Sequence, residues 1–292
     1  MTQARSCLLI GYGYVARATA RALREAGWTV SATARSDEAA GYVEGHGLAV
    51  VRADPATPEG RAALRSAVEA HDAAISSAPP GPDGDPVLPA LQGLRPGQTW
   101  LGYLSTTGVY GDRQGGWAFE WEAPTPGEAR SKARADAEAG WQALGGRIFR
   151  LGGIYGSGRS ALDRVRAGER SVWVKPGQVF GRIHVDDIAS ALIAALERPD
   201  AQGVFNLVDD WPSDQAEVAQ GAAALLSERA LEERTFDPDA VSPMLASFYR
   251  ECRRASNVRA KAVLGWRLAY PDWKSGLEAI LAAEKSYKIN EL

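Results

Sequence analysis

The chain has 292 residues, of which 45% are hydrophobic and 24% charged, so it is long enough for one large or two unequal globular domains. Its formal net charge is −3 without any block of like charge, which argues against nucleic acid or an anionic membrane as a partner. The two cysteines, Cys7 and Cys252, give no disulfide framework and favour a reducing compartment.

The first residues show no targeting signal. The apolar run before Gly11 is only four or five residues long, too short for the core of a signal peptide or for a membrane span. We therefore expect a cytoplasmic protein. Three histidines and two distant cysteines give no ligand spacing typical of zinc, so we expect no metal site.

The first half of the chain alternates short apolar runs with amphipathic ones. Helical patterns cover residues 14–27 and 61–70 and the segment around Lys132. Strands that alternate with helices of this length are typical of crossover units in a parallel sheet, and hence of an α/β fold. The apolar runs that predict strands are residues 6–10, 28–34, 47–53, 72–78, 100–106 and 147–153.

After residue 155 the pattern is less regular. A strong helix is predicted at 184–199, followed by a strand at 203–208 and a helix at 213–228. Residues 235–270 show no clear periodicity and are predicted to be irregular, and the last helix is predicted at 272–286.

A glycine-rich turn follows the first predicted strand. Gly11 suits a tight turn, Gly13 lets a pyrophosphate approach the backbone, and Ala16 lets the following helix pack against the strand. The helix N-terminus then faces the phosphates. This arrangement predicts a dinucleotide site made by Gly11, Tyr12, Gly13, Tyr14, Val15 and Ala16.

The end of the second predicted strand favours NADP over NAD. No carboxylate stands there to hold a ribose 2′-hydroxyl, whereas Arg35 and Ser36 suit a 2′-phosphate. Arg35 can equally be a solvated loop residue. Asp54 is a candidate for the adenine amino group, or else it begins an Asp-Pro turn. The cofactor would also pass close to the small residues after the fourth strand, Ser77, Ala78 and Pro79.

Four motifs occur in an order that resembles the short-chain dehydrogenase/reductase superfamily, in particular its extended, sugar-nucleotide epimerase/dehydratase branch and the atypical members of that branch. They are YLSTTGVYGD (103–112), RLGGIYGSGR (150–159), RIHVDDIASA (182–191) and NLVDDWP (206–212).

This resemblance implies a Rossmann-type doubly wound parallel sheet and a smaller C-terminal substrate domain, with the site in the cleft between them. The Rossmann domain would comprise residues 1–155, with 184–208 returning to it. The substrate domain would comprise residues 156–183 and 209–292.

The resemblance also implies roles for single residues. Thr106 stands where the family has a Ser or Thr that hydrogen-bonds the reacting substrate oxygen. Lys132 stands where the family lysine holds the nicotinamide ribose and lowers the pKa of a tyrosine four residues earlier. That position is Glu128 here, and the glycine motif is G-x-G-x-x-A rather than G-x-x-G-x-x-G. The departure at Glu128 leaves the proton carrier unassigned.

Two interpretations of the segment PTPGEARSKARADAE, residues 124–138, are open. A glutamate, with an ordinary pKa of about 4.3, would be ionised beside positive neighbours and would be a poor proton donor. Thr125 and Glu128 have the spacing of a capping box, and Glu128 and Lys132 that of a favourable pair. We favour the capping role for Glu128. Lys132 either reaches the cofactor or is a surface lysine.

Other candidates follow the fifth and sixth strands, at the sheet edge where ligands bind. Tyr110 and Tyr155 are alternative proton carriers, although each can simply brace its loop. Arg159 can meet a substrate phosphate or be an exposed loop residue.

We expect an NAD(P)-dependent oxidoreductase or an epimerase/dehydratase-type enzyme that acts on a small molecule such as a sugar nucleotide, as a monomer or homodimer. The alternative is a non-catalytic NADP-binding sensor or scaffold that lacks the active-site tyrosine.

Overall fold

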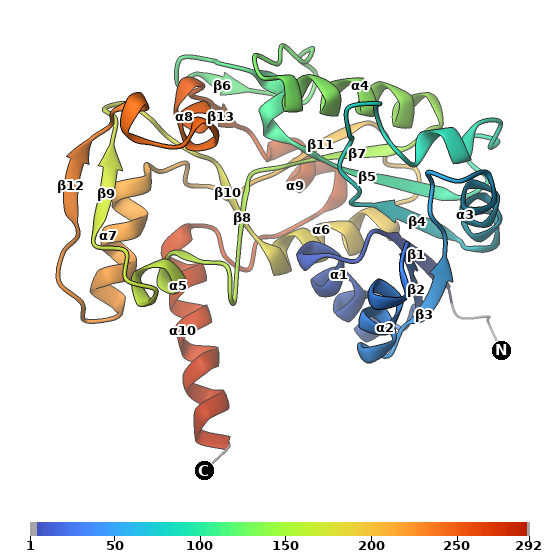
Figure 1. Cartoon of the computed structure of the whole chain (residues 1–292), viewed down its shortest axis with the longest axis horizontal. Helices are drawn as coiled ribbons and strands as arrows, with labels where there is room; N and C mark the ends of the chain where they lie inside the picture. The colour runs from blue at the N-terminus through green and yellow to red at the C-terminus, as the bar shows by residue number, and fades with distance from the viewer. Residues whose placement is uncertain (1–4, 291–292) are drawn as a thin grey trace.

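The computed structural model describes residues 5–290, and its centre is a seven-stranded parallel sheet (Figure 1). The predicted α/β class is therefore confirmed, and each of the seven predicted strands contains an observed one. The sheet has the order β11-β7-β5-β4-β1-β2-β3. Its strands are β1 (Ser6–Ile10), β2 (Thr29–Ala34), β3 (Ala49–Arg52), β4 (Ala73–Ser76), β5 (Trp100–Thr106), β7 (Arg147–Leu151) and β11 (Val204–Leu207).

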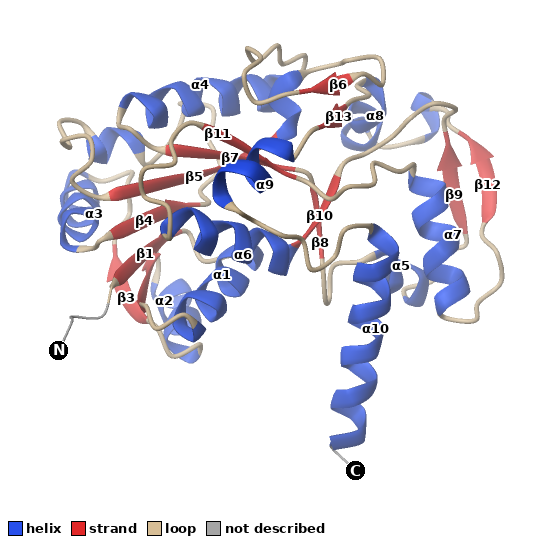
Figure 2. Ribbon diagram, turned by 180° about the vertical axis from the view of Figure 1, so that it is seen from behind, coloured by secondary structure: helices blue, strands red, loops and turns tan. Residues whose placement is uncertain are grey.

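Helices cover both faces of this sheet (Figure 2). On one face α1 (Tyr14–Glu25), α2 (Asp37–Gly45) and α6 (Val185–Leu196) bury the side of β1 that carries Leu9. On the other face α3 (Pro58–Ala70) and α4 (Ala129–Ala143) bury the side that carries Leu8. Successive strand residues point to opposite faces, so an apolar run buried on both sides is what a central parallel strand requires.

The strand order reverses between β1 and β4. From β1 the chain first adds β2 and β3 on one side, and then crosses to add β4, β5, β7 and β11 on the other. A crevice opens beyond the carboxyl ends of the strands at such a switch point, and ligands of open α/β sheets bind in it. The glycine-rich turn follows β1 directly, so it lies at this crevice.

The C-terminal part forms a second, smaller core (Figure 1). Leu162, Ala219, Trp273 and Leu277 are among its buried residues. Short parallel pairs join β8 (Gly153–Tyr155) to β10 (Arg182–His184), β9 (Ser171–Val174) to β12 (Glu232–Thr235), and β6 (Trp117–Ala118) to β13 (Arg254–Ala255). The helices are α5 (Ala161–Arg166), α7 (Gln215–Leu225), α8 (Pro243–Arg250), α9 (Val258–Leu264) and α10 (Trp273–Asn290), the last of which projects from the body of the molecule.

Residues 235–270 are more ordered than their sequence predicts. They contain a 3-10 turn (η3, Pro238–Ala240), α8, β13 and α9. These elements are short, and short elements give weak periodicity. They form because they pack against distant segments, as when β13 pairs with β6 more than a hundred residues earlier. The prediction of an irregular segment was therefore wrong.

Helix α4 begins later than the predicted capping box requires. Its N-cap is Glu128, without a side-chain capping hydrogen bond. The hydroxyl of Thr125, the expected cap, donates instead to the carbonyl oxygen of Tyr110 at 2.7 Å. The carboxylate of Glu128 pairs with Arg250 at 3.1 Å and not with Lys132. The predicted capping box was therefore wrong, because both side chains bond to residues outside the helix start.

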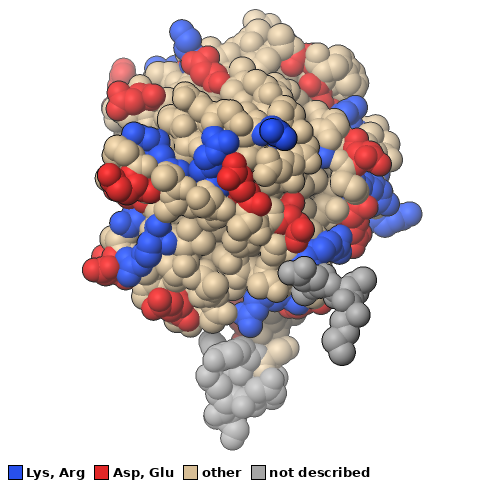
Figure 3. Space-filling model, turned by 90° about the vertical axis from the view of Figure 1, so that its right-hand side faces the viewer, with Lys and Arg blue, Asp and Glu red and all other residues tan. Residues whose placement is uncertain are grey.

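The charged side chains on the face shown in Figure 3 are of both signs and interspersed. Within the described part of the chain, every helix is too short or too polar to cross a lipid bilayer.

Candidate active site

The turn after β1 has the conformation that a dinucleotide pyrophosphate requires. Gly11 has a φ of +86°, and a Cβ there would lie 3.0 Å from the hydroxyl oxygen of Ser77. Gly13 is the extended N-cap of α1, and a Cβ built on it would meet no atom within 4 Å. Any other residue at position 11 would therefore strain the backbone, and the space beside Gly13 is open to a ligand. These residues fit a phosphate group at the N-terminus of α1.

The other residues of this turn have different surroundings. Ala16 is buried in the core between α1 and the sheet, with Val15 packed against the same cluster. Tyr12 meets Tyr42 edge-on, with ring centroids 6.1 Å apart. The Tyr14 hydroxyl donates to the carbonyl oxygen of Ser157 at 3.0 Å and so joins the turn to the loop after β8.

The predicted ribose and adenine contacts lie at the ends of the neighbouring strands. Arg35 is exposed directly after β2. Ser36 is the N-cap of α2, and its hydroxyl oxygen accepts a hydrogen bond from the Ala39 amide at 3.2 Å. A carboxylate oxygen of Asp54 accepts from the Ala56 amide at 3.1 Å, so this residue does form the Asp-Pro turn. Ser77 and Ala78 are half-buried beside Gly11.

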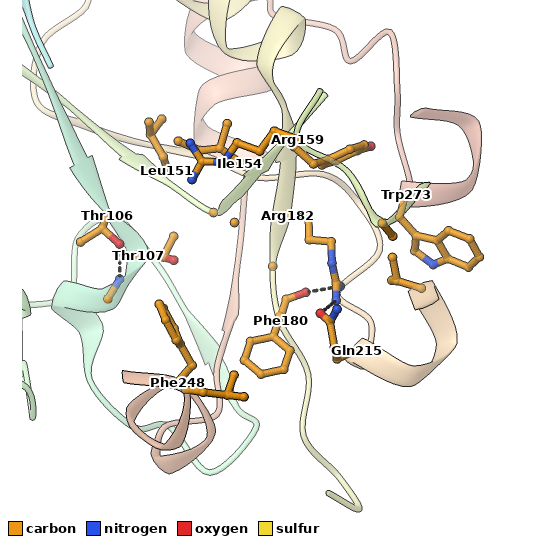
Figure 4. A pocket seen from close by; sticks show the side chains of 18 of the residues that line it. Thr106, Thr107, Leu151, Ile154, Arg159, Phe180, Arg182, Gln215, Phe248 and Trp273 are labelled. Atoms are coloured by element: carbon orange, nitrogen blue, oxygen red, sulfur yellow. Dashed lines mark hydrogen bonds between the residues drawn. The ribbon is translucent and has the colours of Figure 1, made fainter. Parts of the chain in front are cut away.

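A cavity of about 1330 Å³ lies between the carboxyl edge of the sheet and the C-terminal part (Figure 4). Pro79, Thr106 and Leu151 line it on the sheet side, and Arg182 and Trp273 on the other. The residues of the glycine turn do not line it. The cavity therefore lies beyond the turn, in the part of the crevice that faces the smaller core.

Thr106 stands at the end of β5, with its side chain in the wall of this cavity (Figure 4). Its hydroxyl oxygen accepts a hydrogen bond from the Gly108 amide at 3.0 Å and caps the 3-10 turn η2 (Thr107–Tyr110). The hydroxyl proton is not used by that bond and can donate to a group in the cavity.

Helix α4 presents arginines to the cavity rather than the expected lysine. Arg130, Ser131 and Arg134 line the cavity, whereas Lys132 is exposed and does not. The resemblance places the family's tyrosine and lysine at positions 128 and 132, four residues apart. Arg130 and Arg134 have the same spacing. We did not predict this pair from the sequence, although the buried Trp141, with the i, i+3, i+4 pattern before it, could have indicated the inward face.

The two candidate tyrosines have partners in the protein. Tyr110 is fully buried outside the cavity, and its hydroxyl donates to Asn206 at 2.8 Å. Tyr155 lines the cavity, but its hydroxyl donates to the Asp272 carbonyl at 3.3 Å. Burial raises the pKa of both hydroxyls. Arg159 lines the cavity, with its guanidinium 5.6 Å from the ring centroid of Tyr14.

The sheet order, the glycine turn and the cavity against a smaller C-terminal core together make this an extended short-chain dehydrogenase/reductase fold, the fold of NAD-dependent epimerases and dehydratases. Among solved structures it is similar to dTDP-glucose 4,6-dehydratase from Bacillus anthracis, determined in complex with NAD. That enzyme is 15% identical, each chain covers 97% of the other, and the TM-score is 0.76.

Within this fold, the chain belongs to the same family as a conserved protein of unknown function from Silicibacter pomeroyi. The two are 38% identical over 96% of this chain and 99% of the other, with a TM-score of 0.87. A curated relative, the 3-diazoavenalumate denitrifying reductase of a Streptomyces species, is 33% identical over an alignment of 170 residues that covers 53% of this chain. The match spans about half, 55%, of that relative's length. Protein-family models give no match.

Proposed function

We propose that this chain is an NAD(P)-dependent oxidoreductase that acts on a small molecule in the cavity between the sheet and the C-terminal part. One observation carries the proposal. The glycine turn and Thr106 end two strands of one parallel sheet, so a dinucleotide on the turn would extend along the same edge toward a cavity of about 1330 Å³.

The chain's own residues supply the cofactor site. Gly11 and Gly13 allow the pyrophosphate to approach the backbone, and the N-terminal amides of α1 would bind it. Arg35 and the Ser36 region would bind a 2′-phosphate, which favours NADP over NAD. The bound nicotinamide supplies hydride chemistry.

Thr106 would orient the reacting group of the substrate through its hydroxyl. The two tyrosines that line the cavity, Tyr155 and Tyr249, are not placed to give a proton to the substrate, because their hydroxyls donate to backbone carbonyls. A reduction that needs no tyrosine proton fits this site better than an epimerisation or dehydration, which must move protons repeatedly. The Streptomyces relative is, by its name, a reductase.

The alternative is a dinucleotide-binding sensor without turnover. Its support is the start of α4, where glutamate at the N-cap, position 128, and arginine at position 130 stand in place of a catalytic tyrosine. It predicts cofactor binding without reduction of any substrate.

Fluorescence titration with NADPH and NADH tests the proposal. We expect saturable binding of NADPH, and the absence of binding by either cofactor would contradict it. NADPH oxidation over a panel of carbonyl and other reducible compounds then separates the two functions. Turnover that is lost in Thr106→Ala, with cofactor affinity unchanged, excludes the sensor.

A further inference from the structure

The cavity carries a charge opposite to that of the whole chain. Six arginines line it against three carboxylates, a net charge of +3, whereas the formal net charge of the chain is −3. The arginines are Arg130, Arg134, Arg159, Arg164, Arg182 and Arg253, and the carboxylates are Asp163, Glu169 and Glu251.

The carboxylates are already engaged. Glu169 pairs with Arg164 at 3.3 Å and Glu251 with Arg253 at 2.6 Å, while Asp163 closes the capping box of α5. The other four arginines form no ion pair with a carboxylate anywhere in residues 5–290. Like charges gathered in one cavity repel one another, and a bound anion would offset that cost.

The cofactor phosphates do not account for all of this charge. Arg159 lies over the ring of Tyr14, the first residue of α1, so it is placed to meet a cofactor phosphate. In Figure 4 its side chain runs along the cavity wall toward Leu151. Arg130 comes from a different wall, formed by α4 and α8.

Arg130 lines the same cavity as Thr106, and it is exposed there. Its guanidinium donates one hydrogen bond to the Ser247 hydroxyl at 3.0 Å and lies 4.1 Å from the ring centroid of Phe248. The next residue, Ser131, packs so closely on η2 that a Cβ on Gly108 would lie 2.8 Å from its hydroxyl oxygen and 3.3 Å from that of Thr106.

The guanidinium of Arg130 has donors to spare. It carries five N–H donors, and the bond to Ser247 is the one hydrogen bond it makes within the described chain. Its contact with the Phe248 ring restricts the orientations of the side chain, which reduces the entropy lost when an anion binds. A planar fork of this kind suits a carboxylate or a phosphate.

We propose that the substrate carries an anionic group, a carboxylate or a phosphate, close to its reducible centre, and that Arg130 binds this group beside Thr106. The inference rests on the proposed function, because Thr106 marks the reacting centre only if a nicotinamide cofactor binds next to it.

Calorimetric titration with three probes of similar size tests the proposal on the full chain, with and without saturating NADPH. The probes are benzoate, phenyl phosphate and the neutral benzamide, and the first two distinguish a carboxylate from a phosphate site. We expect an anionic probe to bind, benzamide not to bind, and the affinity to fall as NaCl is raised.

Three variants assign the effect to Arg130. Arg130→Gln should weaken binding of the anion by roughly 10- to 100-fold, the range for a charge-assisted hydrogen bond, without changing NADPH affinity. Arg130→Lys keeps the charge and should retain part of the affinity. Arg229→Gln, at an exposed position outside the cavity, is the control. Thermal denaturation shows whether each variant is folded.

The outcomes are distinct. Benzamide binding as tightly as the better of the two anions, no binding of either anion, or an Arg130→Gln variant that binds like the parent would each overturn the inference. Failure to bind NADPH would instead overturn the proposed function, and the titrations without cofactor would still decide the anion site. If Arg130→Gln does not fold, the comparison of Arg130→Lys with the parent and the salt dependence decide.

Discussion

The carboxylate of Glu138 on α4 and the guanidinium of Arg150 on β7 form a buried, two-pronged ion pair. Nη2 of Arg150 lies 2.7 Å from Oε2, and Nε lies 3.1 Å from Oε1. The hydroxyl of Ser105 on β5 also donates to Oε1 at 2.5 Å. The pair thereby fixes the rotation of α4 about its axis. Arg134 and Arg130, one and two turns before Glu138, consequently face the cavity, and Lys132 faces solvent.

Removing one partner of this pair should destabilise the fold strongly. Glu138→Ala leaves the buried charge of Arg150 uncompensated, and we expect a loss of about 3–5 kcal/mol in the free energy of unfolding. Urea denaturation measures it. The control is Asp136→Ala on the exposed side of the same helix, which should change stability by less than about 0.5 kcal/mol. Equal effects of the two substitutions would contradict the role of the pair.

Gly13→Ala should separate cofactor binding from folding. The backbone there is extended and a Cβ meets nothing within 4 Å, so the variant should fold, with a melting temperature lowered by about 2–4 °C because alanine is a poorer N-cap than glycine. The methyl group would occupy the space that the pyrophosphate needs, and NADPH affinity should fall by about tenfold or more. Gly41→Ala, in equally open space on α2, is the control for NADPH affinity. Because Gly41 lies within a helix, this substitution should raise the melting temperature slightly. NADPH affinity unaffected by Gly13→Ala would place the phosphates elsewhere.

Arg35→Ala should change the choice between the two cofactors. Loss of a charge-assisted contact to a 2′-phosphate costs about 1.5–3 kcal/mol, so NADPH affinity should fall roughly 10- to 100-fold. NADH lacks that phosphate and serves as the internal control, with unchanged affinity. Parallel fluorescence titrations give both values. Equal losses of affinity for NADPH and NADH would show that Arg35 does not contact the 2′-phosphate.

Lys132→Ala tests whether the exposed lysine has the role that the resemblance implies. Its side chain does not line the cavity, so we expect unchanged NADPH affinity and stability. Arg134→Ala, two residues further on, should cost about 1–3 kcal/mol of stability, because its guanidinium donates to the Leu104 carbonyl at 2.8 Å and the Tyr103 hydroxyl at 3.0 Å. Weaker NADPH binding in Lys132→Ala would support the resemblance over the observed orientation.

Asp209 should make stability depend on pH. Burial raises its pKa from 3.8 to about 8, against the opposing effects of the nearby Arg182 guanidinium and of backbone amides. Between these values the folded chain binds a proton that the unfolded chain does not, so stability falls as pH rises through this window. The fall should amount to a few kcal/mol.

Asp209→Asn removes this titration. Between pH 6.5 and 8 the free energy of unfolding, measured by urea denaturation, should decline less in the variant than in the parent. Asp187, whose pKa burial raises to about 6, acts in the same direction only below this range. Asp83→Asn, at an exposed carboxylate, is the control. Parallel pH profiles of Asp209→Asn and the parent would contradict the assignment.

The sequence by itself determined the parallel sheet and the glycine turn, because both depend on local patterns. A short apolar run such as residues 6–10, bounded by a glycine turn and followed by a helix, is typical of a doubly buried strand. The turn after it depends on the backbone freedom of Gly11 and the missing side chain of Gly13. The first strand, the turn and the second strand all lie within residues 6–34.

The tertiary structure alone decided which side chains meet at the site. The residues before α4 have the local pattern of a capping box. In the structure, however, Thr125 bonds to Tyr110 and Glu128 pairs with Arg250, so the helix starts later. Its inward face then depends on the pair of Glu138 with Arg150 in the next strand of the sheet. Contacts between residues distant in the chain cost more loop entropy than local ones, and only the packed fold repays that cost. The arginine-lined cavity is a product of those contacts.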